Sequence, residues 1–286
     1  FEHPTVDALA KAIHSKADLH YRPIISLRPE GRQTPLFCVH PAGGSSTVFA
    51  PLVSALKGDR SVYGLQARGL EGDECPFESF EEMVDTYVAA ISAVQPEGEL
   101  NFIGYSVGGV IAHHLACLLS ESGRKVGTVI LMDSVPAIEY DHPELPSKEV
   151  LLRTTAQAYG WQVKENATKD DLLELILESF VKEGLVPRET PIQWVDRMLT
   201  ELLLSGQRLS THRTRKGNFD LVYLLAASAD LDLAANEKRM HWGEYCRSIK
   251  YVPVQTKQNG MLDPVPAQLI AKIVDSFLES CTPYSH

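Results

Sequence analysis

LNFIGYSVGGVIAHHLACLLS, residues 100–120, joins a short apolar run, a glycine-flanked serine and a long apolar pattern of helical period. Leu100 to Ile103 is typical of a buried strand, and Val110 to Ser122 is typical of a helix. Between them, Gly-Tyr-Ser-Val-Gly at 104–108 fits the sharp strand-to-helix turn that exposes a nucleophilic serine. The flanking glycines let strand and helix approach closely. We therefore predict a nucleophile elbow with Ser106 as the attacking residue.

Apolar runs and helical patterns alternate on both sides of this stretch. Strands are predicted at 36–39, 62–65, 100–103, 126–132, 221–226 and 249–254, and helices at 48–56, 80–94, 110–122 and 266–278. Strands that alternate with helices indicate a parallel sheet covered by helices. We expect an α/β protein, specifically the α/β-hydrolase fold with a mostly parallel central sheet and an inserted helical lid.

The strand signals stop between Pro136 and about Arg215. Thr168 and Asp171 have the spacing of a capping box that begins a helix. A helical insertion of about 80 residues after a sheet strand predicts a lid, at about 136–215, over the edge of the sheet that holds the site. Its candidate apolar contacts for a substrate are Leu151, Tyr159, Trp161, Trp194 and Met198.

Composition excludes several classes of function. A net charge of -10 argues against a nucleic-acid partner, because binding phosphates needs a basic face. The apolar runs are shorter than the roughly 20 residues that span a bilayer, and the N-terminus has no signal-peptide pattern. We expect a cytoplasmic protein with no membrane partner. The five cysteines form no C-x-x-C pair, which disfavours a disulfide framework and a zinc site, so no metal is expected. No bound cofactor is expected either.

An acyl-transfer site needs N–H donors aimed at the oxyanion that forms when the serine attacks. Val107, directly after the serine, would supply one N–H from the start of the helix. The second donor normally lies in the loop after an early strand. That loop is His40-Pro41-Ala42-Gly43-Gly44, in which Ala42 is the candidate donor and His40 is expected to brace the loop.

A carboxylate is also needed to orient the general base. Asp133 ends the strand after the elbow helix, at the edge where a parallel sheet presents its ligands. Asp230 and Asp232 follow the strand at 221–226 and occupy the other position from which this architecture can supply the acid. Asp133 is the first candidate and these two are the alternatives.

Four features together resemble one protein family. They are VHPAGG at 39–44, YGLQARG at 63–69, GYSVGG at 104–109, and Asp133 at its distance from the serine. In combination they are similar to the terminal (type I) thioesterase domains of nonribosomal peptide and polyketide synthases. The resemblance implies a serine enzyme that takes an acyl or peptidyl chain from the phosphopantetheine thioester of a carrier domain. It would hold the chain as an ester on Ser106 and release it by hydrolysis or cyclisation.

The N-terminus adds to this resemblance. Phe1 to Ala10 resembles the last helix of the carrier domain that precedes such a thioesterase. The resemblance implies that 1–22 is the end of a carrier domain with a linker, and that 23–286 is the thioesterase domain. An acyl or peptidyl carrier domain is then the expected partner. A general esterase or lipase of the same fold is the alternative enzyme, which the carrier-like segment disfavours.

The family's catalytic histidine is expected after the last strand, in a loop of the form Gly-x-His-x-x-Met-Leu. Counting back from Met261-Leu262 places Gln258 at that position, and no histidine lies between His241 and His286. A glutamine amide cannot accept a proton near neutral pH, whereas an imidazole with a pKa near 6.5 can.

Three accounts of Gln258 remain open. It is a deliberate substitution, or it belongs to a natural variant whose catalysis is altered or absent, or the loop differs and another histidine replaces the base. His241 and His212 are the candidates for that replacement. The alternative function is a catalytically silent domain that binds the carrier or its product without cleaving it.

Overall fold

The computed structural model describes residues 21–70, 74–137, 146–158, 160–182, 186–227, 241–256 and 260–280. Its centre is a seven-stranded sheet in the order β1-β3-β2-β4-β5-β6-β7. The strands are β1 (Ile24–Arg28), β2 (Gln33–Val39), β3 (Arg60–Leu65), β4 (Leu100–Tyr105), β5 (Val126–Met132), β6 (Asp220–Ala227) and β7 (Ser248–Gln255). All neighbouring pairs run parallel except β1 with β3. The predicted α/β-hydrolase fold with a mostly parallel sheet is confirmed.

Strand β1 is the one that the sequence patterns missed. It lies at the edge of the sheet, pairs antiparallel with β3, and changes register between Ser26 and Arg28. Its residues are only partly buried. An edge strand with one open side carries a weaker apolar signal than a strand covered on both faces.

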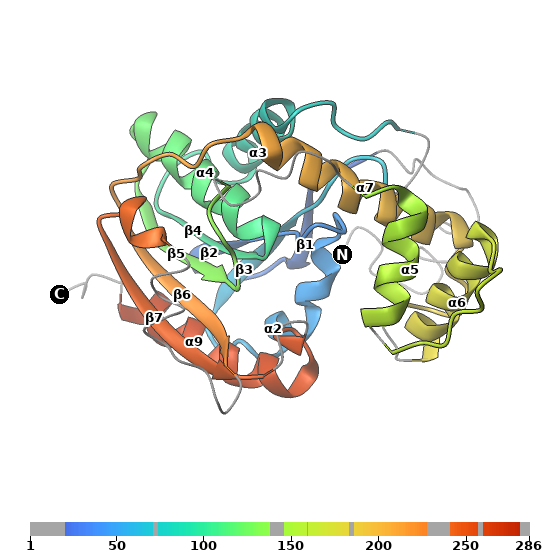
Figure 1. The fold of residues 1–286 in the computed structure, drawn as a ribbon. Helices are drawn as coiled ribbons and strands as arrows, with labels where there is room; N and C mark the ends of the chain where they lie inside the picture. Colours follow the sequence, from blue (N-terminus) through green and yellow to red (C-terminus); the bar gives the residue numbers. More distant parts are fainter. Residues whose placement is uncertain are drawn as a thin grey trace, which may run out of the picture.

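Helices cover both faces of the sheet (Figure 1). On one face lie α3 (Phe80–Val94) and α4 (Val107–Glu121), and on the other α2 (Ala50–Ala55) and α9 (Pro264–Ser280). Each face of the sheet has its own apolar core. Alternate residues of β2 pack in these two cores, because successive side chains of a strand point to opposite faces. Phe37 packs in the core under α3 and α4, whereas Leu36 packs in the core under α2 and α9.

The ends of these helices follow from local sequence. Ser79 caps α3 by accepting the Glu82 N–H at 3.0 Å, and Gly123 follows α4 with a φ of +87°. Before α2, Ser46–Phe49 forms a 3₁₀ turn. The helix predicted at 48–56 is therefore a 3₁₀ turn followed by a short α-helix that begins with Ala50-Pro51.

Between β5 and β6 the chain forms α5 (Lys148–Ala158), α6 (Lys169–Lys182) and α7 (Ile192–Thr211), which we call the helical unit. The predicted capping box is present before α6, where the Thr168 N–H donates to Asp171 Oδ2 at 2.7 Å. The unit has its own apolar core, made of Leu152, Leu172, Leu173, Ile176, Phe180, Val195 and Leu199. Asp196 of α7 binds Lys148 at 2.7 Å and Lys169 at 2.9 Å, which ties the three helices together.

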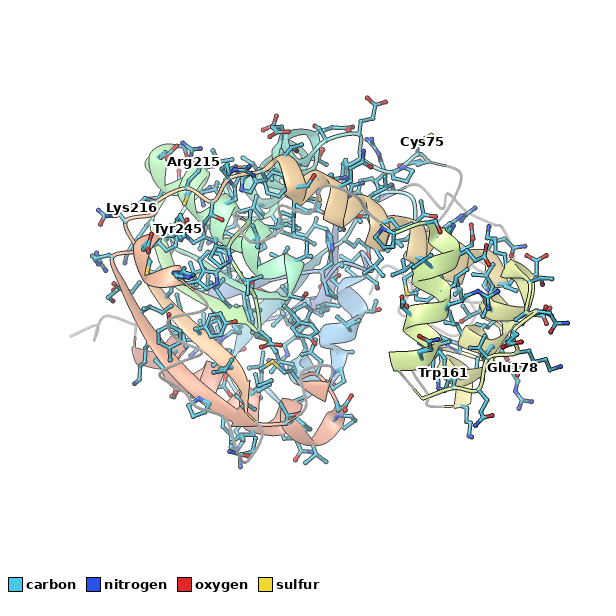
Figure 2. All side chains as sticks on the ribbon, in the orientation of Figure 1. Cys75, Trp161, Glu178, Arg215, Lys216 and Tyr245 are labelled. Atoms are coloured by element: carbon cyan, nitrogen blue, oxygen red, sulfur yellow. The ribbon has the colours of Figure 1, made fainter. Side chains whose placement is uncertain are left out.

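Figure 1 shows α5 and α6 beside the sheet, with α7 running from them back across its edge. Trp161 and Glu178 are among the side chains of this unit labelled in Figure 2. Within the described part of the chain, no helix is both long and apolar enough to cross a bilayer. Phe1 to Ala10, predicted to be a carrier-domain helix, lies outside the described residues.

Candidate active site

Ser106 stands between β4 and α4 in a conformation that few residues other than glycine adopt, with φ 55° and ψ -124°. Its N–H donates to Met132 O at 2.9 Å and so extends the ladder between β4 and β5. Gly104 allows the turn, since a Cβ there would lie 2.1 Å from Gly108 O. Strain of this kind, worth about 1–3 kcal/mol, is concentrated at functional sites. The predicted strand, turn and helix are therefore all present, with the serine at the turn.

The N-terminus of α4 touches the loop that follows β2. A Cβ on Gly108 would lie 2.4 Å from both Val39 O and His40 O. Helix α4 begins at Val107, and the first N–H groups of a helix have no partner within it. The same end of a helix favours negative charge. The contact therefore brings the Val107 N–H close to residues 40–44, which we call the oxyanion loop.

Hydrogen bonds hold the oxyanion loop in one shape. The Gly44 N–H donates to Pro41 O at 2.9 Å and closes a tight turn around Ala42. The His40 ring contacts Pro41 O through Nδ1 and the Tyr87 hydroxyl through Nε2, each at 2.7 Å. Burial lowers the pKa of His40 to about 4, so the ring is neutral at pH 7. It donates through Nδ1, accepts through Nε2, and thus braces the loop.

Asp133 also has a positive φ, of 44°, directly after β5. Its N–H donates to Leu224 O at 3.0 Å, and its Oδ2 atom is shielded from solvent. Tyr105 of β4 pairs with Met132 of β5, so Ser106 and Asp133 each follow a paired strand residue by one position. The two candidates therefore leave neighbouring strands at the same edge of the sheet. Asp230 and Asp232 lie outside the described residues.

The position expected for the base follows β7. Strands β4, β5, β6 and β7 run parallel, so the carboxyl end of β7 lies at the same edge as those of β4 and β5. Strand β7 ends at Gln255, and residues 257–259 lie outside the described residues. Gln258 is one of them, so its assignment to the base position stays a prediction.

The structure gives both replacement histidines contacts with residues other than Ser106. His212 follows α7 and stacks on Phe80 with ring centroids 4.0 Å apart, and it also contacts His114. His114 is eight residues beyond Ser106 on α4, about 12 Å along the helix axis. His241 precedes the 3₁₀ turn Trp242–Glu244, where its half-exposed ring lies 3.8 Å from Glu244 Oε1.

The predicted apolar contacts of the insertion divide into two groups. Leu151, Trp161 and Trp194 pack against the core of the helical unit itself. Met198 also reaches the oxyanion loop, because a Cβ on Gly43 would lie 3.2 Å from Met198 Cγ. Tyr159 lies outside the described residues. Of the described candidates, Met198 is the one for which the structure gives a contact with the proposed oxyanion hole.

Sequence reasoning missed a buried polar group on α7 beside this loop. Glu201, Ser205 and Arg208 are at most 5% exposed, and Ser205 Oγ lies 3.3 Å from Ala42 O. Their spacing of four and three residues places them on one helix face, which was the available signal. A polar stripe on an amphipathic helix is ordinarily assigned to solvent.

No group of three or more histidine, cysteine or acidic side chains that could hold a metal occurs within the described residues. Cys38, Cys117 and Cys246 are buried free thiols, and burial raises the pKa of each. A buried thiol with a raised pKa is a poor nucleophile. These three buried thiols are therefore poor candidates for the attacking group.

Known proteins are similar to this chain in sequence. The thioesterase domain family matches residues 34–221. Nonribosomal peptide synthetase atrA of Aspergillus terreus is 31% identical over 266 residues, which cover 85% of this chain and 28% of atrA. The chain thus spans a minor part of such relatives.

Two solved structures are similar in fold. The first is holo-AB3403, a four-domain nonribosomal peptide synthetase, with a TM-score of 0.77, 21% identity, and coverage of 96% of this chain and 22% of that one. The second is the Vlm2 thioesterase domain, with a TM-score of 0.66, 22% identity, and coverage of 89% and 97%. Because the family match spans more than half of the sequence, this chain belongs to the thioesterase domain family, in the form that occurs in nonribosomal peptide synthetases.

Proposed function

We propose that this chain releases an acyl or peptidyl chain from the phosphopantetheine thioester of a carrier domain, through an ester on Ser106. The observation that carries the proposal is the positive-φ turn at Ser106, held against the oxyanion loop by the contact at Gly108. The relatives support the setting, because atrA is a nonribosomal peptide synthetase of which this chain matches 28%. The carrier domain and its phosphopantetheine arm would arrive as part of the substrate.

In the first half-reaction, Ser106 Oγ attacks the thioester carbonyl carbon and forms a tetrahedral oxyanion. The N–H groups of Val107 and Ala42 donate to that oxygen, in a site where fixed dipoles stabilise developing charge. The intermediate collapses by breaking the C–S bond, and the phosphopantetheine thiolate takes up the proton lost by the serine. The products are an acyl ester on Ser106 and a free carrier thiol.

In the second half-reaction, water or a nucleophile within the bound chain attacks the ester and returns the proton to Ser106. Water gives a free acid, and an internal nucleophile gives a ring. Both half-reactions need a group that takes and returns a proton, which Asp133 would orient. With glutamine at 258, proton transfer has no imidazole at the expected place, so we expect slow acylation and slower release.

The glutamine predicted at the base position, Gln258, also favours a second candidate function. A domain with Gln258 at the base position could bind the carrier or the product and leave the thioester intact. The two functions differ in one observable, which is whether Ser106 ever becomes acylated.

The test uses a serine-directed fluorophosphonate and a short acyl thioester, followed by mass spectrometry of the intact protein and its peptides. Three proteins are compared, namely the unmodified chain, Ser106→Ala and Gln258→His. Labelling at Ser106 that is slow in the unmodified chain and at least about a hundredfold faster in Gln258→His supports the proposal. No labelling of Ser106 in either form would refute the proposed acyl transfer. Equal turnover by the unmodified and Gln258→His proteins would show that the base lies elsewhere.

A further inference from the structure

Helix α7 carries buried polar residues on the face that meets the oxyanion loop. Glu201, Ser205 and Arg208 are 1%, 3% and 5% exposed. Charged side chains are almost never buried this completely unless they are paired, because their desolvation is costly. The arrangement of their partners indicates what they hold in place.

Glu201 and Arg208 form a bidentate ion pair. Arg208 Nη1 donates to Glu201 Oε1 at 2.6 Å, and Nη2 donates to Oε2 at 3.2 Å. The same guanidinium donates to Phe77 O, from Nε at 3.2 Å and from Nη2 at 2.8 Å. A planar guanidinium in such a fork restricts both the position and the orientation of the carboxylate. The ion pair therefore fixes the Glu201 side chain, and Arg208 ties α7 to the segment that precedes α3.

This fixed side chain contacts the oxyanion loop directly. Gly44 has a φ of +84°, and a Cβ there would lie 2.8 Å from Glu201 Cγ. Ser205 Oγ lies 3.3 Å from Ala42 O and 3.1 Å from Glu201 Oε1, and its single proton is donated to one of them at a time. Met198, on the same face one turn earlier, lies beside Gly43. Ala42, Gly43 and Gly44 thus each have a neighbour on α7.

We propose that Glu201, Ser205 and Arg208 are positioning residues for acyl transfer, which hold the oxyanion loop against α7 so that the Ala42 N–H stays aimed at the oxyanion. The inference rests on the proposed function, because it assigns the effect to the same reaction. Helix α7 then links the other two helices of the helical unit, α5 and α6, to the oxyanion hole. An interaction that acts on the developing oxyanion changes kcat more than KM.

The experiment compares Glu201→Gln and Ser205→Ala with Asp196→Asn, all in the Gln258→His protein. Asp196 is a matched control, since it is an ion-paired carboxylate on the same helix whose partners, Lys148 and Lys169, belong to the helical unit. The measurements are kcat and KM for a short acyl thioester, amide hydrogen exchange of residues 40–46, and thermal unfolding. Because Glu201→Gln leaves Arg208 without its counter-charge and could disturb folding, Ser205→Ala provides a milder second variant.

We expect Glu201→Gln to lower kcat by about 10- to 100-fold and Ser205→Ala by about 3- to 10-fold, with KM changed less than about twofold, since a small misplacement of a catalytic group is costly. Exchange of residues 40–46 should rise in both variants and stay unchanged in Asp196→Asn. Unchanged kcat and loop exchange in both variants would overturn the inference. The inference would also be overturned if kcat fell equally in all three variants, Asp196→Asn included, in proportion to their loss of thermal stability.

Failure of the proposed function looks different. In that case the parent Gln258→His protein forms no acyl ester on Ser106. The amide hydrogen exchange of residues 40–46 can be measured even in that case. A rise in Glu201→Gln and Ser205→Ala would show that α7 anchors the loop, and no rise would show that it does not.

Discussion

Gly108 is the point at which the helix of the elbow meets the oxyanion loop, so Gly108→Ala tests the geometry of the site. The added Cβ would lie 2.4 Å from the carbonyl oxygens of Val39 and His40, whereas ordinary contact begins at 3.4 Å. Both atoms belong to the backbone, so no change of rotamer relieves the overlap. The start of α4 and the loop must separate by about 1 Å to reach ordinary contact.

That separation moves the two proposed oxyanion donors apart, because Val107 lies on α4 and Ala42 lies in the loop. A misplacement of about 1 Å costs on the order of 100-fold in rate, which is at the lower end of the cost of losing one oxyanion donor. We therefore expect phosphonylation of Ser106 to slow by about 100-fold. The overpacking itself should lower the free energy of unfolding by about 1–3 kcal/mol.

The assay measures the rate of fluorophosphonate labelling at Ser106 in the Gln258→His protein with and without Gly108→Ala. Gly123→Ala is the matched control at the other end of α4, where φ is +87° and nothing lies within 4 Å of an added Cβ. The control should lose about 1 kcal/mol of stability through its backbone conformation and keep its labelling rate. A folded Gly108→Ala protein that labels within threefold of its parent would refute the reasoning.

Three further predictions concern pH, the acid and the helical unit. Burial lowers the folded-state pKa of His40 and of His113 from 6.5 to about 4, so protons bind the unfolded state first and stability falls as pH drops below about 6.5. Each should cost about 2 kcal/mol of unfolding free energy by pH 5, and a flat stability in urea between pH 7 and pH 5 would contradict this. Asp133→Asn should slow acylation of Ser106 by about 10³-fold or more in the Gln258→His protein and far less in the unmodified chain. The rate of Ser106 labelling in a double-mutant cycle measures both effects. Equal effects in the two proteins would show that Asp133 does not orient the base. Ile176→Ala, in the core of the helical unit, should cost about 2–5 kcal/mol in urea unfolding, and a loss below 1 kcal/mol would show that this core is loosely packed.

Much of the fold was readable from local patterns. Strand β5 and helix α3 were predicted with the bounds that the structure gives, since a run buried on both faces and a capped amphipathic helix carry strong signals. Strand β1 was missed because an edge strand is only partly buried. The helix after the oxyanion loop was predicted as one piece, because periodicity does not distinguish a 3₁₀ turn from the first turn of an α-helix.

The candidate site divides in the same way. Ser106 and its glycines are neighbours in sequence, so their turn could be inferred from one pentapeptide. The brace from His40 to Tyr87 joins residues 47 positions apart, and the contact between Ser205 and Ala42 joins residues 163 apart. No local pattern encodes such partners.

By itself, the sequence predicted the turn at Ser106 and the alternation that makes a parallel sheet, both of which the structure contains, and it predicts glutamine where the family places its base. Each follows from residues close together in the chain, whose backbone conformation and periodicity are set locally. Tertiary structure alone decided that His212 stacks on Phe80, and that α7 contacts the oxyanion loop through Met198 and Ser205. The physical reason is that these contacts depend on how the helical unit and the sheet pack together, which only the folded chain specifies.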